Sequence, residues 1–315
     1  MVMKVEIGVP VYNEESGISE FLVALQAVIL RTKKEFPELA FQLLLLNDGS
    51  NDATVEKIQQ FRFSGFSRVR LISFSRNYGH PAAVSAIIDH ADGNGILLMD
   101  SDFQDDPGII PELVHKWSSG YQSVQVVRTR REESVLFRFC HFIFSRIFRK
   151  LSGLRSDVGT FGIYDRTVVQ AIRAFPERLR YIPGIISSVG FKNSYVYASR
   201  GKRLRGESRV GMLRLIRLGF TAWLSYSAIP IHFITGMGFL ISFLALFAGV
   251  LVIGIKITTQ LAIPGWASLL SAQFFLGGLI ILALGVVGQY VGIIFEEVKH
   301  RPIYLIASED ELHRE

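Results

Sequence analysis

The chain has 315 residues, of which 49% are hydrophobic and 20% charged, and its mean hydropathy of +0.32 is high for a wholly soluble protein. Its net charge of +6 arises mostly between Arg128 and Arg217, directly before two long apolar segments. Attraction to anionic lipid head groups explains this charge more simply than binding to nucleic acid. The single cysteine, Cys140, excludes an internal disulfide and a cysteine metal cluster.

The first third of the chain alternates short apolar runs with helical patterns. The apolar runs predict strands, namely VEIGVPV from Val5, FQLLLLN from Phe41, VRLISFS from Val69 and GILLMD from Gly95. Helical patterns follow them at residues 19–36, 53–61, 81–91 and 107–117. This alternation predicts an α/β fold, with a Rossmann-like, mostly parallel sheet that has helices on both faces.

Each predicted strand is continuously apolar and ends in polar residues. Because ligands bind at the carboxyl ends of the strands in open α/β sheets, we expect a binding site at that edge. The polar residues at the strand ends are Asn13, Asn47, Asp48, Ser75, Arg76, Asp100 and Asp102.

The acidic stretch LLMDSDFQDDP, from Leu97 to Pro107, follows the fourth predicted strand. In an extended segment Asp100 and Asp102 point the same way, and Gln104 adds a third oxygen. Hard oxygen ligands at this spacing suit Mg²⁺ or Mn²⁺, which would take the rest of its shell from water and a substrate diphosphate.

Two further carboxylates of this stretch, Asp105 and Asp106, precede Pro107, the expected first residue of a helix. Carboxylates at that position serve as helix caps, which is the role we expect for both. Since an acidic loop after a strand is commonly only solvated, the metal interpretation depends on the motifs around it.

Two amphipathic segments follow the predicted sheet region. The first, Val135 to Leu151, mixes large apolar residues with four basic ones, a composition that fits either a helix in the membrane interface or an ordinary core helix. The second, from about Gly211 to Tyr226, is also a candidate interfacial helix.

Two apolar segments near the C-terminus predict a transmembrane hairpin. From Arg217 to Lys256 the only side chain between the ends that can carry a charge near neutral pH is His232, and from Gly265 to Phe295 there is none. Each exceeds the roughly 20 residues that cross a bilayer. A pair of buried core helices is the alternative, but such helices normally keep one polar face.

Basic residues flank this pair of segments, while the connector between them is uncharged. The positive-inside rule therefore places the part of the chain before these segments and both termini in the cytoplasm, in a multi-pass protein of the inner (plasma) membrane. The N-terminus does not resemble a signal peptide. The C-terminal RPIYLIASEDELHRE contains a strand-like piece that would otherwise be an unpaired edge, so a homo-oligomer is a further expectation.

Several motifs, in this order and spacing, resemble the family 2 glycosyltransferases with the GT-A fold. They are VPVYNEE from Val9, NDGSND from Asn47, RNYGHPAA from Arg76, MDSDFQDDP from Met99, RTRREES from Arg128, DVGTFGIYDR from Asp157 and YASRGKRLRGES from Tyr197. With the two apolar segments, the pattern covers nearly the whole chain. It looks like the polyprenyl-phosphate glycosyltransferases, most closely the bactoprenol glucosyltransferases, with the dolichyl-phosphate mannose synthases next.

The resemblance implies four parts of the chain. These are a nucleotide-sugar-binding GT-A core at residues 1–134, an acceptor-side part at 135–227, two transmembrane helices at 228–295 and a cytoplasmic tail at 296–315.

The resemblance also implies a donor site and a metal site. Asp100, Asp102 and Gln104 would hold Mg²⁺ or Mn²⁺ on the diphosphate, with Asp102 among the catalytic residues. For Pro10 and Tyr12, the alternative to nucleotide binding is a purely structural role in shaping a turn. The residues implied to bind the nucleotide sugar are Pro10, Tyr12, Glu14, Asp48, Arg76 and Asp100.

For the acceptor, the resemblance implies cationic and hydroxyl groups around a lipid phosphate, whose oxygens match the guanidinium fork. The alternative for the arginines is ordinary positive charge beside a membrane. Asp157 would be catalytic, by orienting or accepting a proton, or else would position an arginine. The residues implied to bind the lipid phosphate are Arg128, Arg131, Ser134, Arg200 and Arg203.

The chain departs from the family pattern at two positions. Asn47 and Thr160 stand where the family usually has aspartates, and neither is an expected metal ligand. An acceptor hydroxyl would need a general base, whereas a lipid phosphate is already anionic near neutral pH, so a carboxylate missing at Thr160 is tolerable.

The implied activity is inverting transfer of glucose from UDP-glucose to a polyprenyl phosphate of the undecaprenyl type. A GDP-mannose-dependent mannose synthase is the alternative, since the two sugars differ at one hydroxyl. A processive polysaccharide synthase normally carries a Q-x-x-R-W motif, which this sequence lacks. A catalytically silent membrane scaffold is the alternative from another class of protein.

Overall fold

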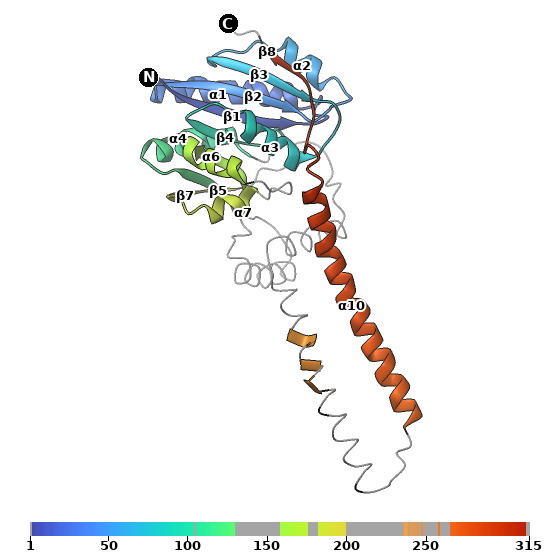
Figure 1. Ribbon diagram of the computed structural model, residues 1–315. Helices are drawn as coiled ribbons and strands as arrows, with labels where there is room; N and C mark the ends of the chain where they lie inside the picture. Colours follow the sequence, from blue (N-terminus) through green and yellow to red (C-terminus); the bar gives the residue numbers. More distant parts are fainter. Residues whose placement is uncertain are drawn as a thin grey trace. The chain divides into compact units, whose positions relative to one another are not determined.

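The computed structural model describes residues 2–103, 105–129, 158–175, 182–199 and 265–312, with a few positions between 236 and 258 (Figure 1). The chain divides into two compact units, one of residues 1–209 with 301–315 and the other of residues 210–300.

The first unit contains an eight-stranded mixed sheet with the strand order β7-β5-β6-β4-β1-β2-β3-β8. The pairs β1–β2, β1–β4, β2–β3 and β5–β7 are parallel, and the pairs β4–β6, β5–β6 and β3–β8 are antiparallel. The predicted α/β fold with a mostly parallel sheet is confirmed. The strands are β1 Met3–Val11, β2 Leu39–Asn47, β3 Arg68–Phe74, β4 Gly95–Leu98, β5 Ser123–Thr129, β6 Val158–Asp165, β7 Asn193–Ser199 and β8 Ile306–Glu311.

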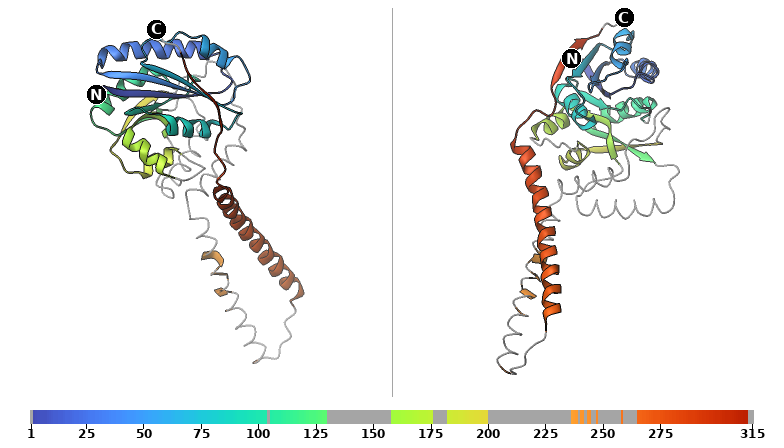
Figure 2. Two further views of the ribbon diagram at one scale, coloured as in Figure 1. Left: turned by 45° about the horizontal axis from the view of Figure 1, so that its top comes forward. Right: turned by 90° about the vertical axis from the view of Figure 1, so that its right-hand side faces the viewer.

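Helices pack on both faces of this sheet, as Figure 2 shows. Alternate residues of β2 point to opposite faces, with Leu43 and Leu45 in the core under α1 and α4, and Leu44 and Leu46 in the core under α3, α6 and α7. Burial on both faces explains why the strand is continuously apolar. The helices of this unit are α1 Ile18–Glu35, α2 Thr54–Gln60, α3 His80–His90, the 3₁₀ turn η1 Pro107–Ile109, α4 Ile110–Ser118, α6 Arg166–Ala174 and α7 Ile182–Ser188.

Helix α3 lies unusually close to the central strand β1. A Cβ atom built on Gly8 of β1 would collide with the side chain of Ile87 in α3. Glycine at this position therefore allows the close approach. It brings α3 against the strand whose carboxyl end forms part of the site described below.

A buried ion pair connects several elements of the sheet. The Arg70 guanidinium donates to Glu6 Oε1 at 2.7 Å, and their side chains are only 8% and 1% exposed. Glu6 Oε2 accepts from the backbone N–H groups of Asp92 and Gly93, while Arg70 also donates to the carbonyl oxygen of His90. The pair thus joins β1 and β3 to the α3–β4 loop.

The C-terminal segment contains a strand, β8, as predicted, but the strand is the mostly polar stretch Ile306–Glu311 that follows the apolar residues, and it pairs with β3 of its own chain. Ser308 is paired with Ser73, and Glu309 reaches Arg70 at 3.2 Å. The segment is therefore not an unpaired tail, and the reason given for a homo-oligomer does not hold. Oligomerisation stays a prediction. The run Glu309, Asp310 and Glu311 gives the new edge strand a charge that discourages pairing with other chains.

The second unit contains the long helix α10, Trp266–Val298. Its part Phe275–Val298 has 24 residues and contains an 18-residue window with a mean hydropathy of 2.2, so it is long and apolar enough to cross a membrane. Phe275 and Ile281 are 69% and 72% exposed. Most of the first predicted span and both candidate interfacial helices lie outside the described residues, so the two-helix hairpin stays a prediction.

We expect Arg70→Met to destabilise the fold, because it leaves the Glu6 carboxylate buried without its counter-charge. Removing one partner of a buried pair costs about 3–5 kcal/mol. Thermal unfolding of the full chain in detergent, followed by circular dichroism, measures the effect. Glu35→Ala is the control, since the Arg31–Glu35 pair is exposed and its loss should leave the midpoint near that of the wild type. Equal midpoints for the two variants would contradict the role assigned to the buried pair.

Candidate active site

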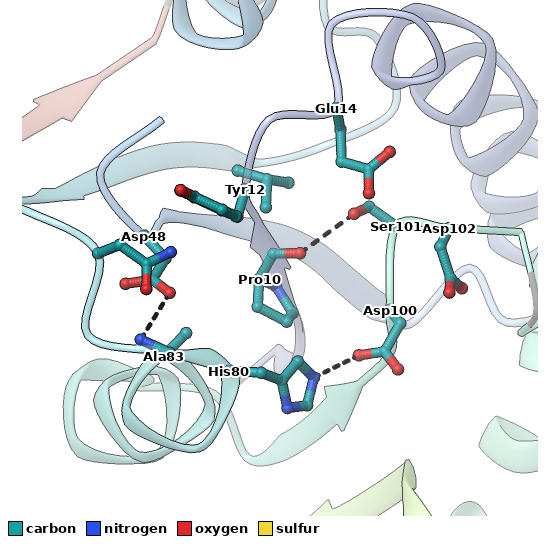
Figure 3. Close-up of a pocket in the computed structure, with 12 residues that line it drawn as sticks. Pro10, Tyr12, Glu14, Asp48, His80, Ala83, Asp100, Ser101 and Asp102 are labelled. Atoms are coloured by element: carbon teal, nitrogen blue, oxygen red, sulfur yellow. Dashed lines mark hydrogen bonds and ion pairs between the residues drawn. The ribbon is translucent and has the colours of Figure 1, made fainter. Parts of the chain in front are cut away.

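A cavity of about 500 Å³ lies at the carboxyl ends of β1, β2 and β4 and the start of α3 (Figure 3). This is the edge of the sheet at which the sequence predicts a ligand, next to the point where β4 is flanked by parallel β1 and antiparallel β6. The residues that line it are Pro10, Val11, Tyr12, Glu14, Asp48, Asn77, Gly79, His80, Ala83, Asp100, Ser101 and Asp102.

Most of the residues that the resemblance implies for the donor come together here. Arg76 is the exception, because it does not line the cavity and its guanidinium lies over the ring of Tyr78 at 4.8 Å from the centroid. Asp102, implied to be catalytic, is also in the lining. The implied donor residues that line the cavity are Pro10, Tyr12, Glu14, Asp48 and Asp100.

The loop after β1 is held by the loop after β2. Asn13, with a positive φ of 53°, accepts a hydrogen bond from the Asn51 N–H at 2.9 Å. The N–H of Glu14 donates to the Thr54 hydroxyl at 2.8 Å. These bonds fix the turn that carries Tyr12, which is 40% exposed, and Glu14 at the cavity.

Asp48 is buried, at 3% exposed, and its carboxylate anchors the start of α3. Its two oxygens accept the backbone N–H groups of Tyr78 and Gly79 at 2.7 and 2.9 Å. Burial raises the pKa of Asp48 above its ordinary value, although these two hydrogen bonds partly oppose the increase. Asp48 therefore positions the loop of residues 75–79 as well as lining the cavity.

Gly49 allows the loops after β2 and β3 to come close. It has a φ of 67°, and a Cβ there would collide with the backbone of Arg76 and lie 2.7 Å from the Asn77 nitrogen. Only glycine fits this approach without strain.

Asn47, one of the departures from the family pattern, has a structural role. Its side-chain oxygen accepts from the Ser50 N–H at 2.9 Å, and its amide nitrogen donates to the Ser73 hydroxyl at 3.3 Å. A carboxylate could accept the first bond but could not donate the second. The other departure, Thr160 of β6, does not line the cavity, and its carbonyl accepts from the Tyr164 hydroxyl.

The loop after β4 supplies the two carboxylates predicted to hold a metal. Asp100 Oδ1 lies 2.8 Å from His80 Nε2 at the start of α3, and the Ser101 hydroxyl donates to the Pro10 carbonyl at 3.2 Å. Asp102 follows in the same loop (Figure 3). The loop therefore faces both β1 and α3.

The two acidic residues that follow have different roles. Asp106 accepts from the Gly108 N–H at 2.8 Å and so caps η1, as predicted. Asp105 was also predicted to be a cap, but the residue that caps η1 is Asp106. Asp105 is 2% exposed, and its carboxylate accepts a hydrogen bond from the N–H of Asp100 at 3.4 Å, so it stabilises the acidic loop.

The carboxylates fit a divalent cation by their chemistry. Asp100 and Asp102 are hard oxygen donors that face one cavity, as Mg²⁺ or Mn²⁺ requires. Among the described residues, no three His, Cys, Asp or Glu side chains form a group that could hold a metal ion. Mg²⁺ commonly takes the rest of its oxygen ligands from water and from substrate phosphates.

His80 is a cavity residue that the motifs did not predict. It lies within RNYGHPAA, but its contact with Asp100 joins residues 20 positions apart. Its position directly before Pro81, at the expected start of a helix behind the binding edge, was the available signal.

The acceptor-side residues lie largely outside the described part of the chain. The backbone of Arg128 is in β5, and parallel pairing places Thr129 of β5 opposite Ser199 of β7. The last described residue before Arg131 and the last described residue before Arg200 are therefore neighbours in the sheet. The predicted residues outside the described ranges are Gln104, Arg131, Ser134, Asp157, Arg200 and Arg203.

The chain is similar to known glycosyltransferases over nearly its full length. It is 35% identical over 305 residues to the uncharacterized glycosyltransferase YkcC of Bacillus subtilis (strain 168), covering 95% of this chain and 92% of the relative. It is 34% identical over 313 residues to a bactoprenol glucosyl transferase of Shigella phage SfV, covering 98% and 99%. A prophage bactoprenol glucosyl transferase homolog of Escherichia coli (strain K12) is 34% identical over 310 residues, covering 96% and 98%.

The fold also matches a solved enzyme. The glucosyl-3-phosphoglycerate synthase of Mycobacterium tuberculosis, solved in complex with Mn²⁺, uridine diphosphate and glucosyl-3-phosphoglycerate, matches with a TM-score of 0.50 and 15% identity over 71% of this chain and 80% of that one. The sequence model of glycosyl transferase family 2 matches residues 6–173, which form most of the sheet and the whole cavity. The chain therefore belongs to glycosyl transferase family 2 and is a glycosyltransferase.

Proposed function

We propose that the protein transfers glucose from UDP-glucose to a polyprenyl phosphate at the cytoplasmic face of the cell membrane, with inversion at the anomeric carbon. The observation that carries this proposal is that Asp48, Tyr12 and the Asp100–Asp102 loop line the same cavity. The cavity volume of about 500 Å³ is within the usual range for small-molecule sites. The names of the bactoprenol glucosyl transferase relatives support glucose as the sugar.

In this proposal the donor spans the cavity from its nucleoside end to its diphosphate end. Tyr12 offers an exposed ring on which a base can stack. Asp48 and Glu14 supply acceptors for the base and ribose, since each carboxylate oxygen has more than one acceptor position. The diphosphate lies toward Asp100 and Asp102, with Gln104 as the proposed third oxygen donor. A Mg²⁺ or Mn²⁺ ion bound by these residues would offset negative charge on the departing UDP.

The acceptor is proposed to be the phosphate of a polyprenyl lipid, held by Arg128, Arg131, Ser134, Arg200 and Arg203. The pairing of Thr129 with Ser199 supports the convergence of these two segments. A phosphate oxygen attacks the anomeric carbon, and the bond from that carbon to the UDP oxygen breaks with both electrons leaving on UDP. Because the nucleophile is already anionic, no general base is needed. Asp157 is proposed to orient this group or an arginine beside it.

The membrane part of the proposal rests on α10 and on the sequence before it. Helix α10 would be the second of two spans, with the first between Arg217 and Lys256, so that the catalytic unit and both termini are cytoplasmic. This topology keeps the isoprenoid tail in lipid while the phosphate lies at head-group level. The four-part division at residues 134, 227 and 295 belongs to the same proposal, as does assembly into a homo-oligomer.

We expect Asp102→Ala to reduce transfer of labelled glucose from UDP-glucose to polyprenyl phosphate by more than about 100-fold, because the substitution removes a metal ligand. The assay uses purified protein with Mn²⁺, and extraction of the labelled lipid gives the rate. Asp106→Ala is the matched control, since Asp106 is an exposed carboxylate four residues away that does not line the cavity. Equal labelling by the wild type and Asp102→Ala would contradict the metal assignment.

The donor is tested by repeating the assay with labelled GDP-mannose. Preference for UDP-glucose is the expected result, and preference for GDP-mannose would make the protein a mannose synthase. No labelling with either donor, together with no metal-dependent heat of nucleotide-sugar binding, would favour the scaffold.

We expect Asp48→Asn to raise the KM for the donor about tenfold and to leave the KM for the lipid unchanged. The asparagine NH₂ would face one of two backbone N–H donors, so a charge-assisted hydrogen bond is lost. Initial rates at varied donor and lipid concentrations separate the two constants. Asp92→Asn is the control, because Asp92 pairs with Arg68 at 3.3 Å and does not line the cavity. A larger change in the lipid KM than in the donor KM would overturn the assignment of Asp48 to the donor side.

A further inference from the structure

The segment that follows α10 belongs to the first unit and packs against β3 and α3. Tyr304 lies six residues after Val298, the last residue of α10. Its ring stacks on Phe74 with centroids 4.9 Å apart and an interplanar angle of 15°. Its hydroxyl donates to Asp89 Oδ2 of α3 at 3.2 Å, and its ring meets the His90 ring edge-on. Tyr304 is thus fixed by contacts on several sides.

Phe74 is the last residue of β3 and the entry to the loop of residues 75–79. It is 3% exposed, and it also contacts the ring of Tyr78 edge-on, with centroids 5.6 Å apart. The next N–H along the chain, that of Ser75, donates to the Leu305 carbonyl at 3.0 Å. The segment that contains Tyr304 therefore contacts the loop through both its ring and its backbone.

The loop of residues 75–79 leads from these contacts to the cavity. The ring of Tyr78 contacts the ring of Phe74, and the guanidinium of Arg76 lies 4.8 Å from its centroid. The Tyr78 hydroxyl is hydrogen-bonded to the Ser75 hydroxyl at 3.2 Å. Its backbone N–H, with that of Gly79, is bound by Asp48. Asn77 and Gly79 line the cavity, so the position of Tyr78 sets the position of part of the cavity wall.

The segment is held in register independently of Tyr304. Strand β8 pairs with β3 from Arg70 to Phe74, and Glu309 adds an ion pair to Arg70 at 3.2 Å. A variant at Tyr304 can therefore lose the ring contacts while β8 stays paired. This separation makes the contribution of the ring measurable.

We propose that Tyr304 is a positioning residue for the donor site, which holds Phe74 and through it Tyr78, so that the loop of residues 75–79 is already ordered when the donor arrives. It acts through other residues and does not itself line the cavity. The inference that the cavity wall is positioned stands on the contacts alone. The consequence for UDP binding rests on the proposed function.

The experiment uses the full chain in nanodiscs and compares the wild type with Tyr304→Ala, Tyr304→Phe and Leu305→Ala. Tyr304→Phe keeps the stack on Phe74 and loses the bond to Asp89. Leu305→Ala is the matched control, because this side chain is 53% exposed and the substitution keeps the backbone carbonyl that binds Ser75. Hydrogen exchange is followed in peptides covering residues 75–79 and residues 306–311, and calorimetry measures UDP binding with Mn²⁺.

Tyr304→Ala should speed exchange at residues 75–79, with β8 still protected, and should weaken UDP binding about three- to tenfold, the order expected for loss of an aromatic pair. Tyr304→Phe should bind UDP nearly as the wild type does, and Leu305→Ala should match the wild type in both measurements. In steady-state assays Tyr304→Ala should raise the donor KM and leave the lipid KM unchanged.

Unchanged exchange at residues 75–79 in Tyr304→Ala would overturn the proposal, as would equal weakening of UDP binding by Leu305→Ala. Loss of protection in β8 and the loop together would also overturn it, since the ring would then only stabilise the segment. If Tyr304→Ala does not fold, Tyr304→Leu removes the stack while keeping apolar bulk, and the same criteria apply. A wild type that binds no UDP would contradict the proposed donor, while the exchange measurement would still decide the positioning role.

Discussion

The convergence of parallel strands at their carboxyl ends is the constraint on which the site depends. Strands β1, β2 and β4 end at one edge of the sheet, so residues far apart in the chain, such as Tyr12, Asp48 and Asp100, reach one cavity. The loops that leave this edge have little regular secondary structure, and hydrogen bonds from side chains fix their positions. Asp48 is the central one, because its two oxygens fix the start of α3, and α3 in turn places His80 against Asp100.

The C-terminal segment extends this arrangement beyond the family-matched region of residues 6–173. Strand β8 covers the outer edge of β3, and the acidic side chains near its end give the sheet a charged edge. Just before β8, Tyr304 stacks on the residue at which β3 becomes the loop of residues 75–79. The segment after α10 is therefore part of the structure that supports the cavity, although it lies more than 200 residues from that loop in sequence.

Local patterns predicted much of the fold. The first four strands and the first three helices lie within two residues of their predicted bounds, and the fourth predicted helix, 107–117, corresponds to the 3₁₀ turn η1 followed by α4, because unbroken apolar runs and turn residues are local signals. The Pro107 that follows Asp106 was enough to predict the Asp106 cap. Three features could not be predicted, because each depends on which distant segments meet: the burial of Asp105, the contact of His80 with Asp100, and the pairing of β8 with β3. The sequence predicted a strand in the C-terminal segment but not its partner. The acceptor-side predictions from Arg131 to Arg203 fall mainly outside the described residues.

The proposed donor site requires that Asp100 and Asp102 hold a divalent cation on the diphosphate of a nucleotide sugar in the cavity beside Asp48. A crystal or cryo-electron microscopy structure of the full chain with Mn²⁺ and UDP-glucose tests it most directly. We expect Mn²⁺ bound to oxygens of both carboxylates and of the diphosphate, with the uracil near Tyr12 and Asp48. Nucleotide bound elsewhere, or Mn²⁺ bound without contact to either aspartate, would contradict it.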